Sequence, residues 1–504
     1  MATQTKKRVD FLNGRLLKKM LLFSVPMILS AMLQLLFNAA DVAVVGKFGG
    51  TVYQSAVGAT SSTIHLIVNL LIGIAVGANV AMATAVGAKD EEKQSRVTHS
   101  AMSLAVLGGL VVMAVGIFLA RPIMTALKTP SDIIEYSVLY MQIYFIGAPA
   151  NIIYNFAAAL FRGIGETKKP LYYLFVSGII NIVINVVTVV FFNMHVIGVA
   201  LGTVVSQYVA AAWVLFDLMR EKSAAKYSIK KTRFHKKETL NILFLGVPSG
   251  ISSCCFSLSN LFIQSTINTY GSIVIAGNTV SINVDGFIDT FSSSVGNTVV
   301  TVVGQNVGAK KYKRLKRAIG SGLLLGAGFM LAGALILAVV GEYIFGIFNS
   351  DPLVVESAMT RMWITSMTYF IVALMQAYGS ALRGMGYSLL PMFVNLICTC
   401  LFRVFWLMWA YPLKPCVEMV YVAYPITWIL SGVVQMILYY ICFHRTVRKE
   451  IGLGNYRPEV ETENPNGKAW APPSPPLPQT ENTLSQGEVL TGENAAQEDL
   501  KTEE

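Results

Sequence analysis

The sequence predicts an all-α membrane protein with twelve transmembrane helices in two six-helix bundles that are related by a pseudo-two-fold axis. Three observations predict this fold: low charge, long apolar runs, and motifs that recur at one fixed distance. Hydrophobic residues make up 54% of the 504-residue chain and charged residues only 13%, whereas a soluble domain carries about 25% charged residues. A soluble globule of this length could not cover its surface with so few charges.

The apolar runs give the positions of the helices. A helix needs roughly 20 residues to cross a hydrocarbon layer of about 30 Å, and the chain contains about twelve such runs. They begin near Leu21, Ala56, Thr98, Ile133, Leu171, Ile197, Asn241, Ile273, Ala318, Val355, Leu389 and Met419. The sequence shows no series of short alternating segments, which would indicate a membrane barrel. Helices must therefore satisfy the backbone hydrogen bonds inside the lipid.

The basic residues lie in alternate loops and predict the orientation. The amino-terminal segment, the central loop and the loop after the eighth run are rich in Lys and Arg, whereas the opposite loops contain only Lys47, Arg121, Lys128 and Lys414. By the positive-inside rule both termini face the cytoplasm. We therefore expect a multi-pass protein of the plasma membrane, which is the inner membrane of a bacterium. The net charge of +11 could suggest binding to nucleic acid. The placement of the basic residues in alternate loops instead indicates that the lipid bilayer is the partner, and we expect no nucleic acid.

Two motifs recur at a constant separation. The sequence Val-Gly-Ala-Lys that starts at Val86 recurs at Val307, and the Arg-Gly-x-Gly motif at Arg162 recurs at Arg383, each 221 residues later. Matches that keep one register indicate an internal duplication of a six-helix unit. Because six is even, the two halves enter the membrane in the same orientation, and a cavity is expected between them.

These patterns divide the chain into five parts. From about Gly452 onward the composition becomes acidic and rich in proline, which predicts disorder. We expect a cytoplasmic amino-terminal segment over residues 1–20, a first six-helix lobe over 21–219, a basic cytoplasmic linker over 220–240, a second six-helix lobe over 241–444 and a disordered acidic cytoplasmic tail over 451–504.

Polar side chains within the first lobe form a candidate site for a coupling ion. Such side chains are costly inside a membrane and often mark a functional path, and several here share helix faces through i, i+4 spacing. They are Gln34, Asn38 and Asp41 on the first helix, Asn181 and Asn185 on the fifth, and Thr203 on the sixth. One carboxylate among neutral oxygens could exchange protons, or Asp41, Asn181 and Asn185 could hold a sodium ion. The alternative is a static hydrogen-bonded interface between helices.

A second candidate site lies in the second lobe. Asp285 and Asp289 stand one turn apart on the eighth helix, and Arg403 and Arg361 are the available counter-charges. This set could serve coupling or substrate binding, or it could be a buried structural ion pair.

Two prolines stand at equivalent points of the halves. Pro26 and Pro248, which are 222 residues apart, each interrupt an intrahelical hydrogen bond, so both are candidate hinges. The Arg-Gly-x-Gly motifs lack the Gly-Lys-Ser/Thr of a phosphate-binding loop, and no catalytic constellation is apparent. We therefore expect no enzyme and no cofactor, but a protein that is driven by a proton or sodium gradient.

Several motifs together resemble those of the multidrug and toxic compound extrusion (MATE) transporters, over nearly all of residues 10 to 450. The motifs are Pro26, Asn38–Asp41, Val45–Gly50, Arg162–Gly165, Gly198–Thr203 and Gln305–Ala309. The resemblance implies antiport of organic, often cationic, compounds against protons or sodium, with alternating access between two lobes. It places Asp41, Asn181, Asn185 and Thr203 at the family's first-lobe coupling site. Many family members carry an acid where this chain has Asn185, so Asp285 in the second lobe remains a candidate.

We thus expect a monomeric secondary active transporter that exports amphipathic, cationic small molecules, as in multidrug efflux. The alternative is a flippase for a lipid-linked oligosaccharide or another lipid, which would need several cations inside the membrane, and Arg361 and Arg403 are the two that the sequence offers. A channel would need polar rings or a filter motif, and neither is apparent.

Overall fold

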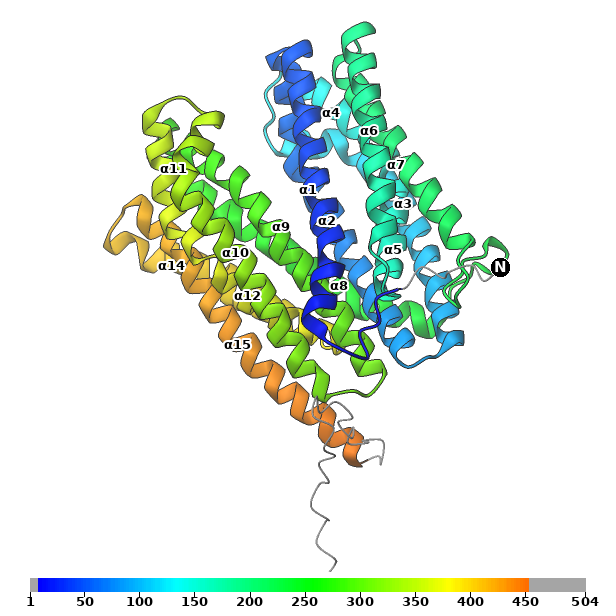
Figure 1. Cartoon of the computed structure of the whole chain (residues 1–504). Helices are drawn as coiled ribbons and strands as arrows, with labels where there is room; N and C mark the ends of the chain where they lie inside the picture. The colour runs from blue at the N-terminus through cyan, green and yellow to red at the C-terminus, as the bar shows by residue number, and fades with distance from the viewer. Residues whose placement is uncertain (1–7, 453–504) are drawn as a thin grey trace, which may run out of the picture. The chain divides into compact units, whose positions relative to one another are not determined.

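The computed structural model describes residues 8–452, and within this range the chain is built from helices and short connections (Figure 1). The predicted acidic tail falls outside the described residues, except for its first two residues, which end the last helix. Both the amino-terminal and the carboxy-terminal half contribute six passes, and Figure 1 shows α1 to α7 as one group and α9 to α15 as another.

The first lobe contains seven α-helices that make six passes. They are α1 (Leu16–Val44), α2 (Thr51–Gly87), α3 (Glu91–Ala126), α4 (Ile134–Ile146), α5 (Ala148–Gly163), α6 (Lys168–Val186) and α7 (His195–Met219). Helices α4 and α5 form one span that is bent by 46°. The π-helical segments η1 (Val45–Gly49) and η2 (Val187–Phe191) extend α1 and α6.

The second lobe repeats this layout. Its helices are α8 (Lys236–Ile267), α9 (Ser272–Gly308), α10 (Lys313–Phe348), α11 (Pro352–Ile364), α12 (Phe370–Gly384), α13 (Leu389–Val394), α14 (Phe402–Trp409) and α15 (Val417–Gly452). Helices α13 and α14 are joined through the π-helical segment η6 (Asn395–Leu401) into a single span.

Twelve passes follow from these helices. Nine spans in residues 8–452 are long and apolar enough to cross a membrane, and the bent pair α4–α5 makes a tenth. Helix α9, which carries many hydroxyl and amide side chains, and the broken pair α11–α12 complete the set. The predicted fold class is confirmed. Several helices begin before their apolar runs because their first turns are polar: α3 begins at Glu91, where the Asp90 carboxylate caps it by accepting the Lys93 N–H at 2.9 Å.

The repeated Arg-Gly-x-Gly motifs form tight turns between helices. Gly165 follows α5 with φ of +88°, and Gly386 follows α12 with φ of +92°. Glycine adopts such positive φ values without steric cost. The two halves therefore reverse the chain with the same backbone conformation at equivalent positions.

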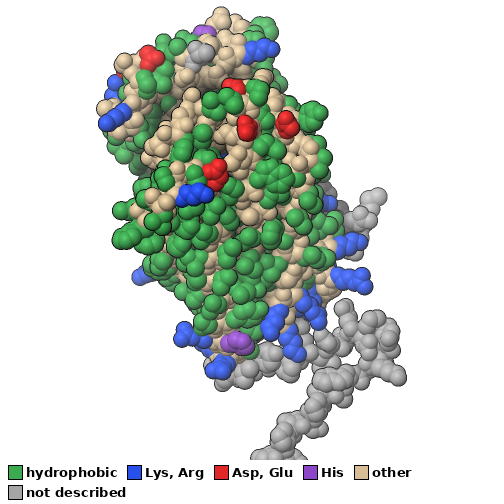
Figure 2. Space-filling view, turned by 90° about the vertical axis from the view of Figure 1, so that its left-hand side faces the viewer, with side chains coloured by type: hydrophobic (Ala, Val, Ile, Leu, Met, Phe, Trp, Pro, Cys, Tyr) green, Lys and Arg blue, Asp and Glu red, His purple; other side chains and the backbone are tan. Residues whose placement is uncertain are grey.

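The surface has the composition of a membrane-embedded protein. Figure 2 shows hydrophobic side chains over the middle of one face, while most Lys and Arg side chains in view lie toward its lower end. Large apolar side chains such as Phe118, Leu324 and Val339 are well exposed, which suits contact with lipid tails. We call the end that carries the loop after α2, the loop after α7 and the loop after α9 the basic side.

The two lobes pack against each other on the basic side. Helices α2 and α8 approach through paired glycines: an added Cβ at Gly73 would meet the backbone of Gly250, and one at Gly77 would meet the backbone of Gly246. Nearby, the amide nitrogen of Asn79 lies 3.1 Å from the hydroxyl of Thr301 on α9. Only residues without a side chain allow helix backbones to come this close.

Replacing Gly77 by valine is expected to open this packing. The new side chain would collide with the backbone of Ile242 and Gly246, and overpacking costs about 1–3 kcal/mol, where each 1.4 kcal/mol is about tenfold in an equilibrium. The test uses a protein whose own six cysteines are replaced by alanine and which carries Asn79→Cys. With Gly77→Val added, this cysteine should react with a membrane-impermeant thiol reagent about tenfold faster than without it. Gly328→Val is the control, because a Cβ there enters open space. Equal reactivity in both variants would contradict the prediction.

Candidate functional site

The first lobe contains a cavity of about 320 Å³. Helices α1, α2, α4, α5, α6 and α7 line it, and Thr290 of α9 reaches it from the second lobe. Aromatic rings from Phe37, Tyr144 and Tyr154 form part of the wall, and most other lining side chains are amides, hydroxyls or aliphatic groups. Of the described residues that line this cavity, Asp41 alone carries a charge.

The Asp41 carboxylate is surrounded by hydrogen-bond donors. It is 8% exposed, and it accepts from the amide nitrogen of Asn185 at 2.5 Å and from the hydroxyl of Thr203 at 3.2 Å. Asn181 satisfies both ends of its amide when its nitrogen donates to Asp41 at 2.9 Å and its oxygen accepts the Thr203 backbone N–H at 3.3 Å. Three neutral donors thus compensate one buried carboxylate.

Local sequence explains why these side chains meet. Asn181 and Asn185 are one turn apart on α6 and face α7, where Gly202 leaves room for the Asn185 amide: a Cβ on Gly202 would overlap its oxygen. The Thr203 hydroxyl also contacts the Val199 carbonyl oxygen at 3.0 Å. The site therefore depends on a glycine directly before the threonine, in the Gly198–Thr203 motif.

The structure places the six predicted first-lobe residues in or next to the wall of the same cavity, four of them in one hydrogen-bonded group. Asp41, Asn181, Asn185 and Thr203 form one hydrogen-bonded group. Gln34 and Asn38 line the same cavity along α1 and make no hydrogen bond to Asp41 within the described part of the chain. The role of these residues in coupling remains a prediction.

Sequence reasoning did not identify several other polar residues of the cavity. Asn151 and Asn155 lie one turn apart on α5, with the Asn155 amide nitrogen 3.0 Å from the Asn151 side-chain oxygen, and Gln207 follows Thr203 by one turn on α7. The i, i+4 spacing that identified Asn181 and Asn185 would also have found these residues.

In the second lobe Asp285 pairs with Arg361 and not with Arg403. The Asp285 carboxylate contacts the Arg361 guanidinium and accepts the Ser366 hydroxyl at 2.8 Å, while Arg361 also donates to the Ser281 hydroxyl oxygen at 2.8 Å. Asp285 is 4% and Arg361 3% exposed. The two charges thus form a buried ion pair.

The other two predicted members of this second site make no hydrogen bond to the pair within the described residues, although Arg361 and Arg403 lie against the same Tyr424 ring, at 5.7 Å and 4.3 Å. The Asp289 side chain is exposed. Arg403 donates to the Asn260 side-chain oxygen at 2.9 Å and to the Ser259 hydroxyl at 3.1 Å, with its guanidinium 4.3 Å from the centre of the Tyr424 ring. The π-helical segment η6 before α14 shifts the rotation of the helix, so that Arg403 faces α8 and α15. Of the two available counter-charges, Arg361 is thus the one that pairs with Asp285, and a role of Asp285, Asp289 and Arg403 in coupling or substrate binding remains a prediction.

The candidate hinges lie inside α1 and α8, as Pro26 and Pro248. Each proline removes one intrahelical hydrogen bond, and the hinge role remains a prediction. No cluster of three or more His, Cys, Asp or Glu side chains that could hold a metal ion occurs within residues 8–452.

Comparison with known families decides the classification. The family model MatE matches the chain twice, over residues 26–187 and 248–408. The chain belongs to the MATE family. This confirms the resemblance that the motifs indicate, and the two matches begin at Pro26 and Pro248, the equivalent prolines of the duplication.

Other MATE proteins share most of their length with this one. It is 28% identical over 388 residues to the probable multidrug resistance protein YoeA of Bacillus subtilis, which covers 75% of this chain and 83% of that protein. It is 25% identical over 387 residues to the probable multidrug resistance protein NorM of Thermotoga maritima, covering 75% and 82%. The multidrug export protein MepA of Staphylococcus aureus is 23% identical over 415 residues, covering 79% and 91%.

Solved MATE structures share the fold. An outward-facing multidrug resistance MATE transporter superposes with a TM-score of 0.82 at 18% identity, over 88% of this chain and 100% of that one. A MATE structure in the bent conformation gives a TM-score of 0.83 at 18% identity, over 89% and 100%. MATE proteins are membrane transporters, so this chain is a multi-pass transporter of small molecules.

Proposed function

We propose that this protein exports amphipathic, cationic small molecules by alternating access, in antiport with protons or sodium. The observation that carries the proposal is Asp41, the one charged side chain among the described residues that line the first-lobe cavity. The relatives named multidrug resistance or export proteins support a broad set of organic substrates.

The lining of the cavity fits such substrates. Phe37, Tyr144 and Tyr154 offer flat apolar surfaces to a hydrophobic body, while the amides and hydroxyls bind polar groups in several orientations. A positive charge on the substrate would be balanced by Asp41. A volume of about 320 Å³ accommodates a drug-sized molecule.

The surroundings of Asp41 favour protons over sodium as the coupling ion. All three neighbours turn hydrogen-bond donors, and not oxygen ligands, toward the carboxylate. Sodium prefers oxygen ligands, so its binding would require the amides of Asn181 and Asn185 to present their oxygens. In the proposed cycle, proton uptake by Asp41 from outside weakens its hold on a cationic substrate and releases it.

The remaining expectations follow from the positive-inside rule. We place the basic side and both termini in the cytoplasm, the protein in the bacterial plasma membrane, and the transporter as a monomer. The flippase alternative is not favoured, because none of the described residues that line the cavity is Lys or Arg, and a lipid-linked phosphate would need such cations.

Vesicles that contain the purified protein test the proposal. We expect an imposed pH gradient to drive an organic cation such as ethidium across the membrane, and the same vesicles with a sodium gradient at constant pH to show little transport. Sodium-driven movement without a pH gradient would reverse the assignment of the ion. Movement of a lipid-linked sugar, with no movement of any amphiphilic cation under either gradient, would overturn the efflux proposal.

A further inference from the structure

Helix α1 contacts both lobes, and its packing changes near Pro26. Before the proline, Leu16, Met20 and Phe23 are buried in a cluster whose other members, such as Val299 and Leu315, belong to α9, α10, α12 and α15 of the second lobe. After the proline, α1 packs on α6 and delivers Asp41 to the first-lobe cavity. The first turns of α1 are thus part of the second lobe by packing, although they precede the first lobe in the chain.

The residues before α1 continue this attachment to the second lobe. We call residues 8–15 the strap. The Phe11 ring is buried in the same cluster and packs edge-on against Phe23 at 5.1 Å. Its carbonyl oxygen accepts from Arg314 at 3.3 Å and from Asn306 at 3.4 Å, and the Gly14 carbonyl oxygen accepts from Arg314 at 2.9 Å. Several bonds and a buried ring therefore fix the strap to the turn between α9 and α10.

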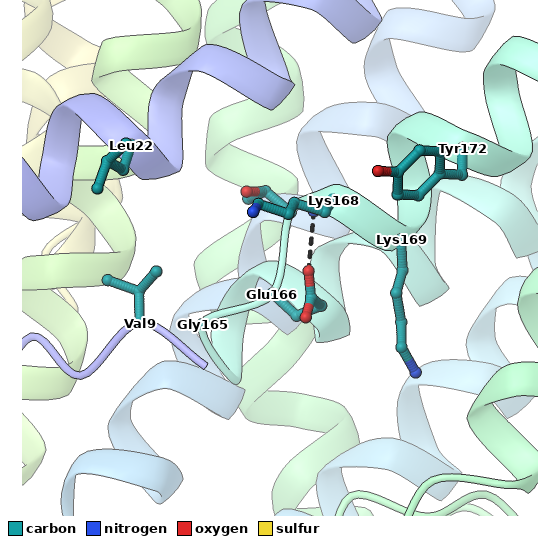
Figure 3. Close-up of a pocket in the computed structure, with 8 residues that line it drawn as sticks. Val9, Leu22, Gly165, Glu166, Lys168, Lys169 and Tyr172 are labelled. Atoms are coloured by element: carbon teal, nitrogen blue, oxygen red, sulfur yellow. Dashed lines mark hydrogen bonds between the residues drawn. The ribbon is translucent and has the colours of Figure 1, made fainter. Parts of the chain in front are cut away.

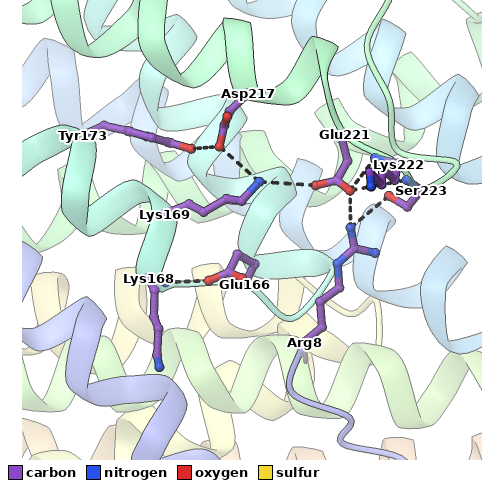
Figure 4. Close-up of polar contacts among 9 residues, drawn as sticks. All are labelled: Arg8, Glu166, Lys168, Lys169, Tyr173, Asp217, Glu221, Lys222 and Ser223. Atoms are coloured by element: carbon purple, nitrogen blue, oxygen red, sulfur yellow. Dashed lines mark hydrogen bonds and ion pairs between the residues drawn. The ribbon is translucent and has the colours of Figure 1, made fainter. Parts of the chain in front are cut away.

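The first residues of the strap reach the opposite lobe. The guanidinium of Arg8 donates to Glu221 at 2.5 Å and to the Ser223 hydroxyl at 3.3 Å, both just after α7 (Figure 4). The Val9 N–H donates to the carbonyl oxygen of Gly165, in the turn between α5 and α6, at 3.2 Å. The strap thus bridges the two lobes on the basic side.

Side chains of the first lobe position Glu221, the carboxylate that Arg8 contacts. Figure 4 shows Lys169 between two carboxylates, with its amine 3.1 Å from Asp217 and 3.7 Å from Glu221. The Tyr173 hydroxyl donates to Asp217. The α6 side chains therefore position the end of α7 whether or not Arg8 is bound.

The joint between strap and first lobe is held by polar contacts rather than by a packed core. A cavity of about 310 Å³ lies beside it, lined by Val9, Leu22, Gly165, Thr167, Lys168 and Tyr172 among others (Figure 3). By contrast, Phe11 on the other side of the strap is fully buried. The Arg8 side chain is 37% and the Glu221 side chain 9% exposed. A few partly exposed polar contacts contribute less stability than a buried ring in a packed cluster, so the strap should separate from the first lobe and stay on the second.

We propose that Arg8 and Glu221 take part in the transport cycle as a releasable latch between the lobes. When the lobes are packed on the basic side, the latch is closed. When they separate there, the strap and the first turns of α1 remain with the second lobe. The contacts of Arg8 with Glu221 and of Val9 with Gly165 then break, as does the hydrogen bond from the Thr167 hydroxyl to the Phe23 carbonyl oxygen. This inference rests on the alternating access of the proposed function.

The latch does not depend on titration near neutral pH. Burial opposes ionisation of Glu221, but Arg8, the Lys222 backbone N–H and Lys169 together hold the pKa of its carboxyl below the ordinary value of 4.5. A lowered pKa in the folded state gives a contribution that is present above about that value and is lost as the pH falls through the folded pKa. At neutral pH the movement of the lobes must therefore break the latch.

Tethering the strap tests the latch with two cysteine pairs in the full chain, after its own six cysteines are replaced by alanine. Pair one is Arg8→Cys with Ser223→Cys, which ties the strap to the first lobe. Pair two, the matched control, is Asn13→Cys with Lys311→Cys, which ties the strap to the second lobe, where Lys311 already contacts the Asn13 side-chain oxygen at 3.4 Å. A short bis-thiosulfonate linker, which a reducing agent removes, joins either pair.

We expect the first tether to lower ethidium export by about tenfold, the effect of roughly 1.4 kcal/mol. Removal of the linker with a reducing agent should restore export. The second tether should leave export unchanged, because strap and second lobe move together. Unchanged export with the first tether, or equal loss with both, would overturn the proposal.

A second readout keeps this test separate from the proposed function. In the same background, a cysteine at Asn79, in the packing between the lobes, is labelled with an impermeant thiol reagent from the basic side. The first tether should slow labelling by about tenfold, while Glu221→Gln should accelerate it severalfold. Arg121→Gln, which breaks an exposed ion pair with Glu135, is the control and should have no effect. A labelling rate that changes neither with the first tether nor with Glu221→Gln would contradict the latch proposal, even if export is normal. Loss of export with the expected labelling rates would count against the proposed function only.

Discussion

Changing Asp41 to asparagine is expected to reduce gradient-driven export strongly. Asparagine keeps the size of the side chain and can still bond to Thr203 and Asn185, so the contacts between α1, α6 and α7 survive. It cannot exchange a proton, and it has no charge to offer a cationic substrate. Because a charge interaction shielded from water is worth more than 1.4 kcal/mol, the export rate should fall by at least about tenfold.

The measurement is ethidium export from vesicles under an imposed pH gradient, at equal amounts of inserted protein. Asp289→Asn is the matched control, since it removes a carboxylate that is exposed and lies outside the first-lobe cavity. Its export should match that of the unchanged protein. Full export by Asp41→Asn would remove the basis of the coupling proposal, and loss in the control alone would move the coupling site to the second lobe.

Breaking the Asp285–Arg361 pair from one side is expected to destabilise the second lobe strongly. Arg361→Gln leaves the Asp285 carboxylate buried among neutral partners such as the Ser366 hydroxyl, with no positive charge beside it. Uncompensated buried charges of this kind cost about 3–5 kcal/mol. Thermal unfolding of the purified variant in detergent, with intrinsic fluorescence as the signal, measures the loss.

The double variant Asp285→Leu with Arg361→Met separates stability from transport. Apolar residues of similar volume often replace a buried ion pair without loss of stability, so we expect the double variant to recover most of the unfolding free energy. We also expect normal export, because neither residue lines the first-lobe cavity. A stable double variant that does not export would show that the pair takes part in transport itself.

Much of the fold could be predicted from the sequence because membrane helices leave a strong local signal. A run of roughly 20 apolar residues in a bilayer forms a transmembrane helix, because a helix satisfies all of its backbone hydrogen bonds internally. The duplication was visible because glycines at the helix turns, such as Gly165 and Gly386, must recur wherever the turn recurs. Spacing placed Asn181 and Asn185 on one face of their helix, and the resemblance to the MATE transporters placed them with Asp41 and Thr203.

The partners of the second lobe could not be predicted in this way. Arg361 and Arg403 are both arginines within apolar segments, and the choice between them depends on the rotation of α14, which the π-helical segment η6 sets. Single-turn insertions of this kind leave no clear pattern in the sequence. The attachment of Phe11 to the second lobe was also not predicted, because contacts between distant segments do not appear in local periodicity.

The polarity of α9 has a consequence for the biogenesis of the protein. Unlike its neighbours α8 and α10, α9 is not among the spans of residues 8–452 that are apolar enough to cross a membrane alone, and it contains Asp285 and Asp289. Each central Asp costs about 2.5–3.5 kcal/mol during insertion by the translocon. During synthesis α9 should therefore wait beside the insertion machinery and enter the bilayer together with α10, with Asp285 neutralised only once Arg361 has emerged from the ribosome.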